Sequence, residues 1–433
     1  MKSYDIALKT YTQPDAQVRL GLIKRPAIQK KEMAEIIDGV FDQVNRHGDE
    51  ALLALTKKFD KVDLTSLEVT EEERKEGLSQ LDPSLQKAID RAYDNITKFH
   101  EAQRLEVRKV ETSPGVVCWR EMRPIDRVGL YIPGGTAPLF STVLMLGCPA
   151  QVAGCDDVIL CTPPNQAGRV HPAILYAAHL CGIKQIYKVG GSQAIAAMVL
   201  GTDTIPQVYK IFGPGNQFVT AAKMKGLSYG VAIDLPAGPS EVLVYADASA
   251  HPSFIAADLL SQAEHGIDSQ VVLVTTDPSL PAKVKAQLDL QLPKLSRANT
   301  AVVSLSHAFA CIFEEVSSAY AFINQYAPEH LIISSDQATD QITFVNTAGS
   351  VFVGHYTPES AGDYASGTNH TLPTAAYARA YSGVSLDSFT KKITFQEISK
   401  EGIKDLGPTI ITMANNEELT AHAHAVQIRL DQL

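Results

Sequence analysis

Gln262 and His265 place a side-chain amide and an imidazole three residues apart in the helical-looking segment 257–266. Residues at positions i and i+3 are neighbours on a helix surface, so both side chains could reach one metal ion. Asp258 lies one turn earlier on the same face and could orient the ligands. The alternative is a helix surface that simply carries two polar residues. A metal site is favoured over this alternative only if other segments of the chain supply further metal ligands.

Two such segments exist. Residues 360–370 are rich in glycine and small polar residues, which is typical of a loop, and include Asp363 and His370. Near the C-terminus, Asn415 or Asn416 is expected to cap a helix that carries His422 in its second turn. Amide, carboxylate and imidazole groups without thiolates suit zinc or another borderline divalent ion.

Composition limits the class of protein. The chain has 433 residues, 45% hydrophobic and 20% charged, which predicts a globular protein of two or more domains. Its net charge of −10, with no dense Lys/Arg cluster, argues against nucleic acid or an anionic membrane as partner. No apolar run approaches the roughly 20 residues of a membrane span, and the first residues fit neither a signal nor a transit peptide. A cytoplasmic location is expected.

The six cysteines show no C-x-x-C spacing and several stand in apolar surroundings. In a reducing compartment they are expected to be buried thiols rather than disulfides. A nucleophilic cysteine for aldehyde oxidation stays an alternative, but none has an adjacent histidine or basic residue that would lower its pKa.

The order of patterns predicts an α/β fold. Residues 31–44, 50–55 and 85–100 have helical periodicity, which indicates a helical N-terminal region. From residue 128 onward, β-branched runs alternate with glycine turns and Ala-rich helices, which is typical of parallel sheets with crossover helices. A hinge at 235–239 separates two series of strands, and a small unit follows residue 389. The predicted strands are 128–131, 158–161, 186–189 and 209–212 in the first series, and 241–245, 270–275, 301–304, 330–334 and 350–354 in the second.

Three glycine turns follow strands of the first series, at 134–136, 190–193 and 213–216. None fits G-x-G-x-x-G or the P-loop pattern. Each nevertheless precedes a helix, where backbone N–H groups and the helix dipole can receive phosphate. One such turn alone would be an ordinary loop between a strand and a helix. Three of them favour a nucleotide cleft at the carboxyl edge of the sheet.

Glu329 and His330 follow Pro328 directly before an apolar strand. Proline favours an extended or turn conformation here, and strand ends in α/β proteins collect active-site residues. An acid and a base side by side could act as two proton carriers. A solvated strand entrance is the alternative.

Seven segments, taken in order, resemble histidinol dehydrogenase, and the resemblance extends from about Arg25 to His422. They are Tyr131-Ile-Pro-Gly-Gly, Val189-Gly-Gly-Ser-Gln-Ala, Phe212-Gly-Pro-Gly-Asn, Leu235-Pro-Ala-Gly-Pro-Ser-Glu, Leu260-Ser-Gln-Ala-Glu-His, Tyr326-Ala-Pro-Glu-His-Leu and Gly367-Thr-Asn-His.

The resemblance implies roles for individual residues. Zinc, one per subunit, would be held by Gln262, His265, Asp363 and His422. NAD would lie near Tyr131, Gln193 and Asn216, and Glu329 and His330 would handle protons. The substrate L-histidinol would be contacted by Ser240, Gln262, His265, His330, Asp363, His370, Glu417 and His422. Ideal helix geometry would favour Glu418 over Glu417, because Glu418 would lie one turn from His422.

The resemblance also implies two Rossmann-like parallel-sheet domains, a helical N-terminal region and a small C-terminal tail domain. The expected parts are a helical arm (1–26), a discontinuous α/β domain with the metal and catalytic residues (27–127 and 238–385), an NAD-binding α/β domain (128–237) and a C-terminal domain (386–433). In a homodimer this last domain would supply His422 to the partner subunit. The implied activity is the NAD-dependent oxidation of L-histidinol to L-histidine through L-histidinaldehyde. A zinc hydrolase and a non-catalytic metabolite-binding protein remain the other two classes.

Overall fold

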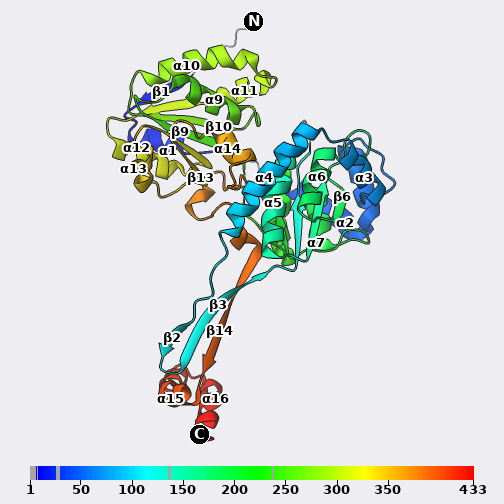
Figure 1. Ribbon diagram of the computed structural model, residues 1–433, viewed down its shortest axis with the longest axis vertical. Helices are drawn as coiled ribbons and strands as arrows, with labels where there is room; N and C mark the ends of the chain where they lie inside the picture. Colours follow the sequence, from blue (N-terminus) through cyan, green and yellow to red (C-terminus); the bar gives the residue numbers. More distant parts are fainter. Residues whose placement is uncertain (1–5, 7, 26–29, 135–137, 237) are drawn as a thin grey trace.

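The computed structural model describes residues 6, 8–25, 30–134, 138–236 and 238–433. Figure 1 shows three parts: two α/β units side by side and a slender arm that projects below them and ends at the C-terminus. Each α/β unit is built on a parallel sheet, and the arm on an antiparallel one. This confirms the predicted fold class.

The first unit contains a five-stranded parallel sheet. In spatial order its strands are β6 (Gln185–Lys188), β5 (Asp157–Thr162), β4 (Arg127–Tyr131), β7 (Lys210–Phe212) and β8 (Ala232–Ile233). Its crossover helices are α5 (Phe140–Ala153), α6 (Pro172–Leu180), α7 (Gly191–Leu200) and α8 (Gln217–Gly226). Because helices cover both faces, the central strands are almost continuously apolar and buried.

The N-terminal helices belong to this first unit. They are α2 (Lys30–Phe59), α3 (Glu71–Ser79) and α4 (Pro83–Glu101). Helix α2 is kinked at Gly48, whose φ is 48°, and this break separates the two predicted helical segments. Apolar faces of α2 and α4 enter the two cores that flank the five-stranded sheet. The expectation that 27–127 join 238–385 in one domain is therefore corrected: α2–α4 complete the core of the five-stranded unit.

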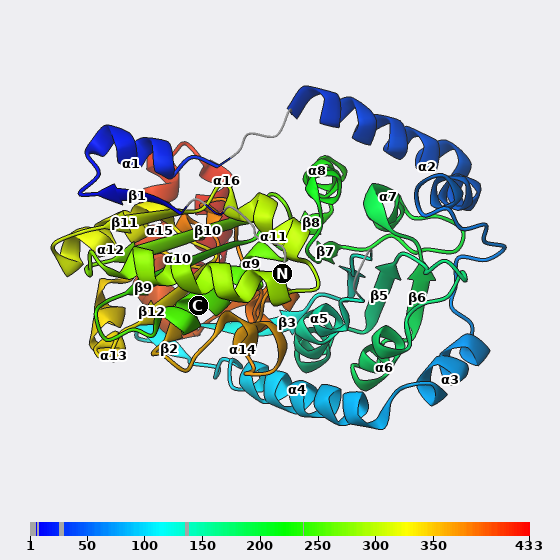
Figure 2. The same cartoon turned by 90° about the horizontal axis from the view of Figure 1, so that it is seen from above.

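The second unit contains a six-stranded parallel sheet. In spatial order its strands are β1 (Lys9–Thr12), β11 (Phe309–Ile312), β10 (Gln270–Thr275), β9 (Glu241–Ala246), β12 (His330–Ser334) and β13 (Ser350–Val353). Its helices are α1 (Ala16–Leu22), α9 (Pro252–Ala263), α10 (Leu280–Gln291), α11 (Ala298–Leu305), α12 (Val316–Tyr326), α13 (Ala338–Gln341) and α14 (Glu359–Tyr364). Figure 2 shows this unit beside the five-stranded unit, with α4 along one side of the molecule.

Two predictions for this unit are wrong. Residues 301–304, predicted as a strand, lie in helix α11, because burial there recurs at Ala298, Ala301 and Leu305, with a helical period. The strand comes later, as β11. The expected N-terminal helical arm also differs, since residues 9–12 form β1 and pair in parallel with β11 before α1 begins.

The arm combines residues from two distant parts of the chain. Strands β2 (Val110–Ser113), β3 (Val116–Pro124) and β14 (Thr390–Ile398) form an antiparallel sheet, followed by α15 (Lys400–Asn416) and α16 (Thr420–Leu430). Nine residues of β14 pair with β3. The C-terminal unit therefore includes residues 110–124, which the sequence analysis had placed in a different domain. No helix among the described residues is long and apolar enough to cross a membrane.

Candidate active site

A cavity of about 390 Å³ lies where the carboxyl edge of the five-stranded sheet meets the amino edge of the six-stranded sheet. From the first sheet it receives the turn after β7, including Asn216. From the second it receives Glu329 and His330, at the start of β12. Glu329 and His330, the predicted proton carriers, thus stand at the amino end of a strand, whereas active-site residues of α/β proteins were expected at carboxyl ends.

The backbone of Glu241, the first residue of β9, holds both members of the pair. Its N–H donates to Glu329 Oε2 at 2.8 Å, and its carbonyl accepts from His330 Nδ1 at 3.0 Å. Since a carbonyl can only accept, Nδ1 carries a proton, and the neutral ring keeps its lone pair on Nε2. His330 Nε2 is buried and has no hydrogen-bond partner among the described residues. When the ring is neutral, this nitrogen can take a proton from a ligand.

Three carboxylates surround His330. Glu329 Oε2 and Glu359 Oε1 lie 3.7 and 3.5 Å from its Nδ1, and Asp363 Oδ1 lies 3.5 Å from its Nε2. Burial alone would lower the pKa of His330, but these carboxylates outweigh burial and raise it well above the usual value. Burial raises the pKa of Glu329 to about 8, although His330 opposes the shift. Perturbed acids and bases in contact are typical of catalytic sites.

Glu359 is a site residue that the sequence analysis missed. It is 1% exposed, and burial raises its pKa despite the nearby His330. A signal was present: Glu359 precedes Asp363 by four residues in α14, and this spacing places both carboxylates on one helix face. A buried acid one turn before a predicted ligand could have been added to the site.

His370 links the two units at the cavity wall. Its Nδ1 donates to the Asp363 carbonyl at 2.9 Å, which leaves Nε2 to accept from the Thr142 hydroxyl of α5 at 3.1 Å. Burial lowers the pKa of His370. A neutral ring with both nitrogens engaged orients neighbouring groups and is poorly placed to carry protons. Ser240, the other predicted substrate contact here, also lines the cavity.

The predicted metal ligands are only partly brought together. His265 and Asp363 line the cavity, and Gln262 in α9 is completely buried with both amide atoms unpaired among the described residues. His265 itself lies just after α9, where its N–H donates to the Gln262 carbonyl at 3.2 Å. Desolvation lowers the pKa of His265. Among the described residues, His330, Glu359 and Asp363 also lie close enough together that they could hold a metal ion, with one possible ligand atom from each within 4.8 Å of the others.

His422 and Glu417 are not part of this cavity in the same chain. His422 is exposed on α16, at the far end of the arm from α14 (Figure 1). The expected helix start at Asn415 or Asn416 is wrong, because α15 continues through Asn416 and α16 begins at Thr420. Glu417 ends α15, and Glu418 has a φ of 59°. Glu418 therefore lies outside the helix that carries His422 and is not placed one helical turn from it.

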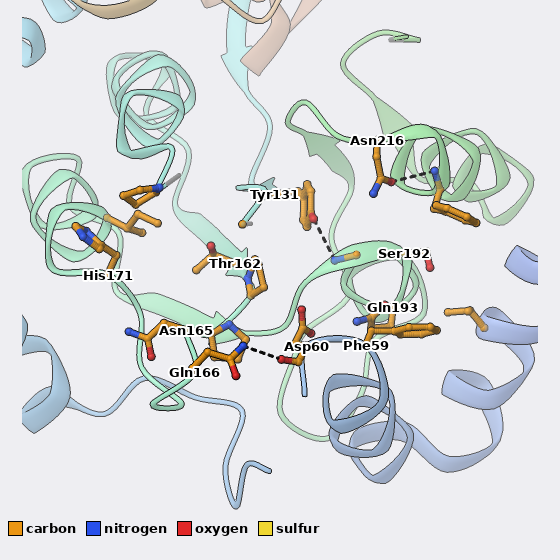
Figure 3. A pocket seen from close by; sticks show the side chains of 18 of the residues that line it. Phe59, Asp60, Tyr131, Thr162, Asn165, Gln166, His171, Ser192, Gln193 and Asn216 are labelled. Atoms are coloured by element: carbon orange, nitrogen blue, oxygen red, sulfur yellow. Dashed lines mark hydrogen bonds between the residues drawn. The ribbon is translucent and has the colours of Figure 1, made fainter. Parts of the chain in front are cut away.

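A second cavity, of about 790 Å³, lies at the carboxyl edge of the five-stranded sheet. Tyr131, Gln193 and Asn216, the predicted cofactor contacts, all line it (Figure 3). Asn216 also lines the catalytic cavity, so the two spaces adjoin. Burial raises the pKa of Tyr131 to about 12, and its hydroxyl accepts from the Gly191 N–H at 3.0 Å.

The glycine turns have the expected positions. Gly190 caps α7, and Asn216 caps α8 with its Oδ1 accepting from Phe218 and Val219 N–H groups, so only its amide nitrogen is free for a ligand. A side chain at Gly213, whose φ is 134°, would place its Cβ 2.1 Å from the Tyr131 carbonyl. Gly135 and Thr136 of the first turn lie outside the described residues.

The cysteines do not support the alternative of a thiol nucleophile. All six are free thiols, four are buried, and none lines either cavity among the described residues. Burial raises the pKa of Cys155 and of Cys311 to about 12, which keeps both thiols protonated and inert.

Fold and site together define a two-unit α/β enzyme, with an acid–base pair beside a nucleotide-sized cleft. The family model for histidinol dehydrogenase matches residues 23–430. The histidinol dehydrogenase of Bacteroides thetaiotaomicron is 53% identical over 98% of this chain and 100% of its own length. That of Photobacterium profundum is 51% identical over 95% of this chain and 93% of its own. The crystal structure of histidinol dehydrogenase from Elizabethkingia anophelis has a TM-score of 0.97 at 52% identity and covers 99% of both chains. The chain belongs to the histidinol dehydrogenase family.

Proposed function

We propose that this enzyme oxidises L-histidinol to L-histidine through L-histidinaldehyde, with two NAD reduced in succession and one zinc ion per subunit. The observation that carries the proposal is the Glu329–His330 pair in a cavity that shares Asn216 with a nucleotide-sized cleft. Proton carriers beside a dinucleotide are what successive alcohol and aldehyde oxidation requires.

The zinc site is supported by the donors present. Gln262, His265 and Asp363, with His422 of the partner subunit, would hold the ion, and the unpaired buried amide of Gln262 requires some such partner. Bound zinc would fix the amine and imidazole of the substrate and so orient its reacting carbon. We favour these ligands over the group that includes His330, because a metal on Nε2 would remove the free lone pair.

His330 is the base for both oxidation steps. In the first step its Nε2 takes the hydroxyl proton while the carbinol carbon gives up a hydride. NAD, when bound, would accept this hydride. Its Nδ1 stays bonded to the Glu241 carbonyl, which keeps the ring in place and in the required tautomer. The nearby carboxylates raise its pKa and so make the neutral ring a stronger base.

Glu329 is the base for hydration of the aldehyde between these steps. In the ionised form, which predominates above its pKa of about 8, one carboxylate oxygen accepts the Glu241 N–H, and the other can take a proton from water as the water oxygen bonds to the aldehyde carbon. The carbonyl oxygen meanwhile takes up the proton that His330 received in the first step, which gives the neutral hydrate and returns His330 to its neutral form. The hydrate then gives up a second hydride from its carbon and a hydroxyl proton to His330, which leaves the carboxylic acid. General bases of this kind contribute about 10²- to 10⁴-fold.

The test is the yield of NADH per histidinol consumed. Two NADH per substrate, and loss of activity with a chelator that returns on adding zinc, are expected. A zinc hydrolase would consume substrate without NADH, and a metabolite-binding protein would consume none. Either result would reject the proposed function.

We also propose that the active site is shared across a homodimer. Seven of the nine residues of β14 are exposed, and α16 has one buried residue, Ala423. Exposed apolar side chains on the arm include Ile393, Met413, Leu419 and Ile428. A thin sheet with so little core of its own is expected to pack against another chain. That packing would bring His422 to the partner's cavity.

Mixing two inactive variants tests the shared site. His265→Ala and His422→Ala should each release zinc and abolish oxidation. A hybrid dimer would contain one pocket with both substitutions and one with neither, so random exchange should restore about a quarter of normal activity. Each variant mixed with itself is the control. No recovery after verified exchange would show that His422 serves its own chain.

A further inference from the structure

One carboxylate, Asp60, lies in the wall of the cofactor cavity, immediately after α2. It is half-buried, and its Oδ2 is buried without a hydrogen-bond partner among the described residues. Its backbone carbonyl accepts from Gln166 Nε2 at 3.4 Å. In Figure 3 Asp60 lies between Gln166 and Gln193, with its carboxylate towards the interior of the cavity. The backbone of Asp60 is thus held in place, and its side chain brings to the cavity wall a carboxylate oxygen without a partner among the described residues.

The surroundings of Asp60 suit one end of a dinucleotide. Phe59, Ile36 and Val40 form an apolar part of the same cavity wall, against which a planar base can pack. Thr162 is fully buried at the end of β5, and its hydroxyl also lacks a partner among the described residues. A ligand with an apolar ring and adjacent hydroxyl groups would satisfy both unpaired polar atoms.

The charges of the cavity exclude a phosphate at this position. No lysine or arginine is found among the described residues that line it. His171 is its one imidazole, and burial lowers the pKa of that ring. The ring is also occupied, because its Nδ1 accepts the Ala173 N–H. A phosphate beside Asp60 would therefore meet a negative charge and no compensating cation.

On the basis of the proposed function, we propose that Asp60 accepts a hydrogen bond from the 2′-hydroxyl of the adenosine ribose and thereby selects NAD over NADP. In the usual dinucleotide fold this acid follows the second strand of the sheet, about 20 residues beyond a glycine-rich turn. Here it comes from a helix that precedes the sheet, which accounts for the absence of that sequence fingerprint.

The test compares NAD and NADP as oxidants in Asp60→Asn. The ratio of kcat/KM for NAD to that for NADP should fall about 10- to 100-fold, the range expected when a hydrogen bond to a charged group is lost. Asp63→Asn is the matched control, because it removes the same charge from a side chain that is 73% exposed and paired with Lys57. Its ratio should equal that of the unaltered enzyme.

A second measurement needs no variant. ADP-ribose should compete with NAD in the unaltered enzyme more strongly than 2′-phospho-ADP-ribose, and equal competition would overturn the role of Asp60. An unchanged NAD/NADP ratio in folded Asp60→Asn would do the same while leaving the proposed function intact. If the unaltered enzyme formed no NADH from histidinol, the proposed function would fail, and direct titration with the two ADP-ribose compounds would still decide the role of Asp60.

Discussion

The two parallel sheets share one strand order but are used at opposite edges. In chain order, the strands of the five-stranded sheet lie third, second, first, fourth, fifth, and β9–β13 repeat this order with β1 added outside β11. The cofactor cavity lies at the carboxyl edge of the first sheet, whereas Glu329 and His330 lie at the amino edge of the second. Equal topology therefore does not determine which edge carries the chemistry.

The difference follows from what each edge offers. At the carboxyl edge, strands lead into helix N-termini, such as Gly190 before α7 and Asn216 before α8, which present N–H groups to a ligand. At the amino edge, the first residue of β9 offers an N–H and a carbonyl that fix two side chains of the adjacent strand. One edge presents backbone N–H groups that could receive a charged ligand, and the other uses its backbone to orient Glu329 and His330.

The largest expected effect separates the two edges by kinetics. His330→Asn should lower kcat for both oxidation steps by about 10²- to 10⁴-fold, because no base then takes the proton. The activity of the unaltered enzyme should fall as pH falls, since protonation of His330 Nε2 removes the lone pair. The residual activity of His330→Asn should not show this fall with pH. Tyr131→Phe should mainly raise KM for NAD, by about 2- to 10-fold, through loss of the Gly191 contact. Similar kcat losses in both variants would contradict the division between edges.

A smaller and more selective effect is expected at Glu329. Glu329→Gln should slow oxidation of the aldehyde by about 10²-fold and leave the first hydride transfer nearly unchanged, because only hydration of the aldehyde needs this carboxylate. Single-turnover assays begun from histidinol and from histidinaldehyde measure the two stages separately. Equal damage to both would show that Glu329 acts in the first step as well.

Structural features that depend on neighbouring residues in the chain could be predicted from the sequence. Strands β9, β10 and β12 were predicted within one residue of their observed bounds, because apolar runs bounded by turn residues are a local signal. Glu329 and His330, predicted from a proline-led strand entrance, and Asn216, predicted from a glycine turn, line the two cavities, while their roles stay predictions.

Long-range packing decided what the sequence analysis missed. Helix α11 contains two valines that suggest a strand, yet packing against α9 and β10 fixes it as a helix. Residues 116–124 pair with β14, more than 260 residues later, which no local pattern indicates. The spacing of Glu359 to Asp363 in α14 was a local signal, whereas its contact with His330 of another strand could be seen only in the fold.

The smallest predicted effect concerns stability at the amino edge of the six-stranded sheet. Asp258 in α9 is partly buried, and desolvation raises its pKa to about 7, from about 4 in an unfolded chain. The folded state therefore binds the proton more tightly, so the free energy of unfolding should fall as pH rises from about 4 to about 7. Asp258→Asn removes this cost and should stabilise the protein at pH 8, by about 1–2 kcal/mol after allowance for partial exposure, but hardly at pH 4.

Thermal unfolding of Asp258→Asn at both pH values is the measurement. Asp336→Asn, at the carboxyl edge of the same sheet with its side chain 80% exposed, is the control and should show little change at either pH. If both substitutions change the thermal stability equally, the loss of stability from desolvated carboxylates is not concentrated at the edge that carries Glu329 and His330. If only Asp258→Asn gains stability, this edge keeps a buried negative charge at a cost in stability that the exposed opposite edge does not bear.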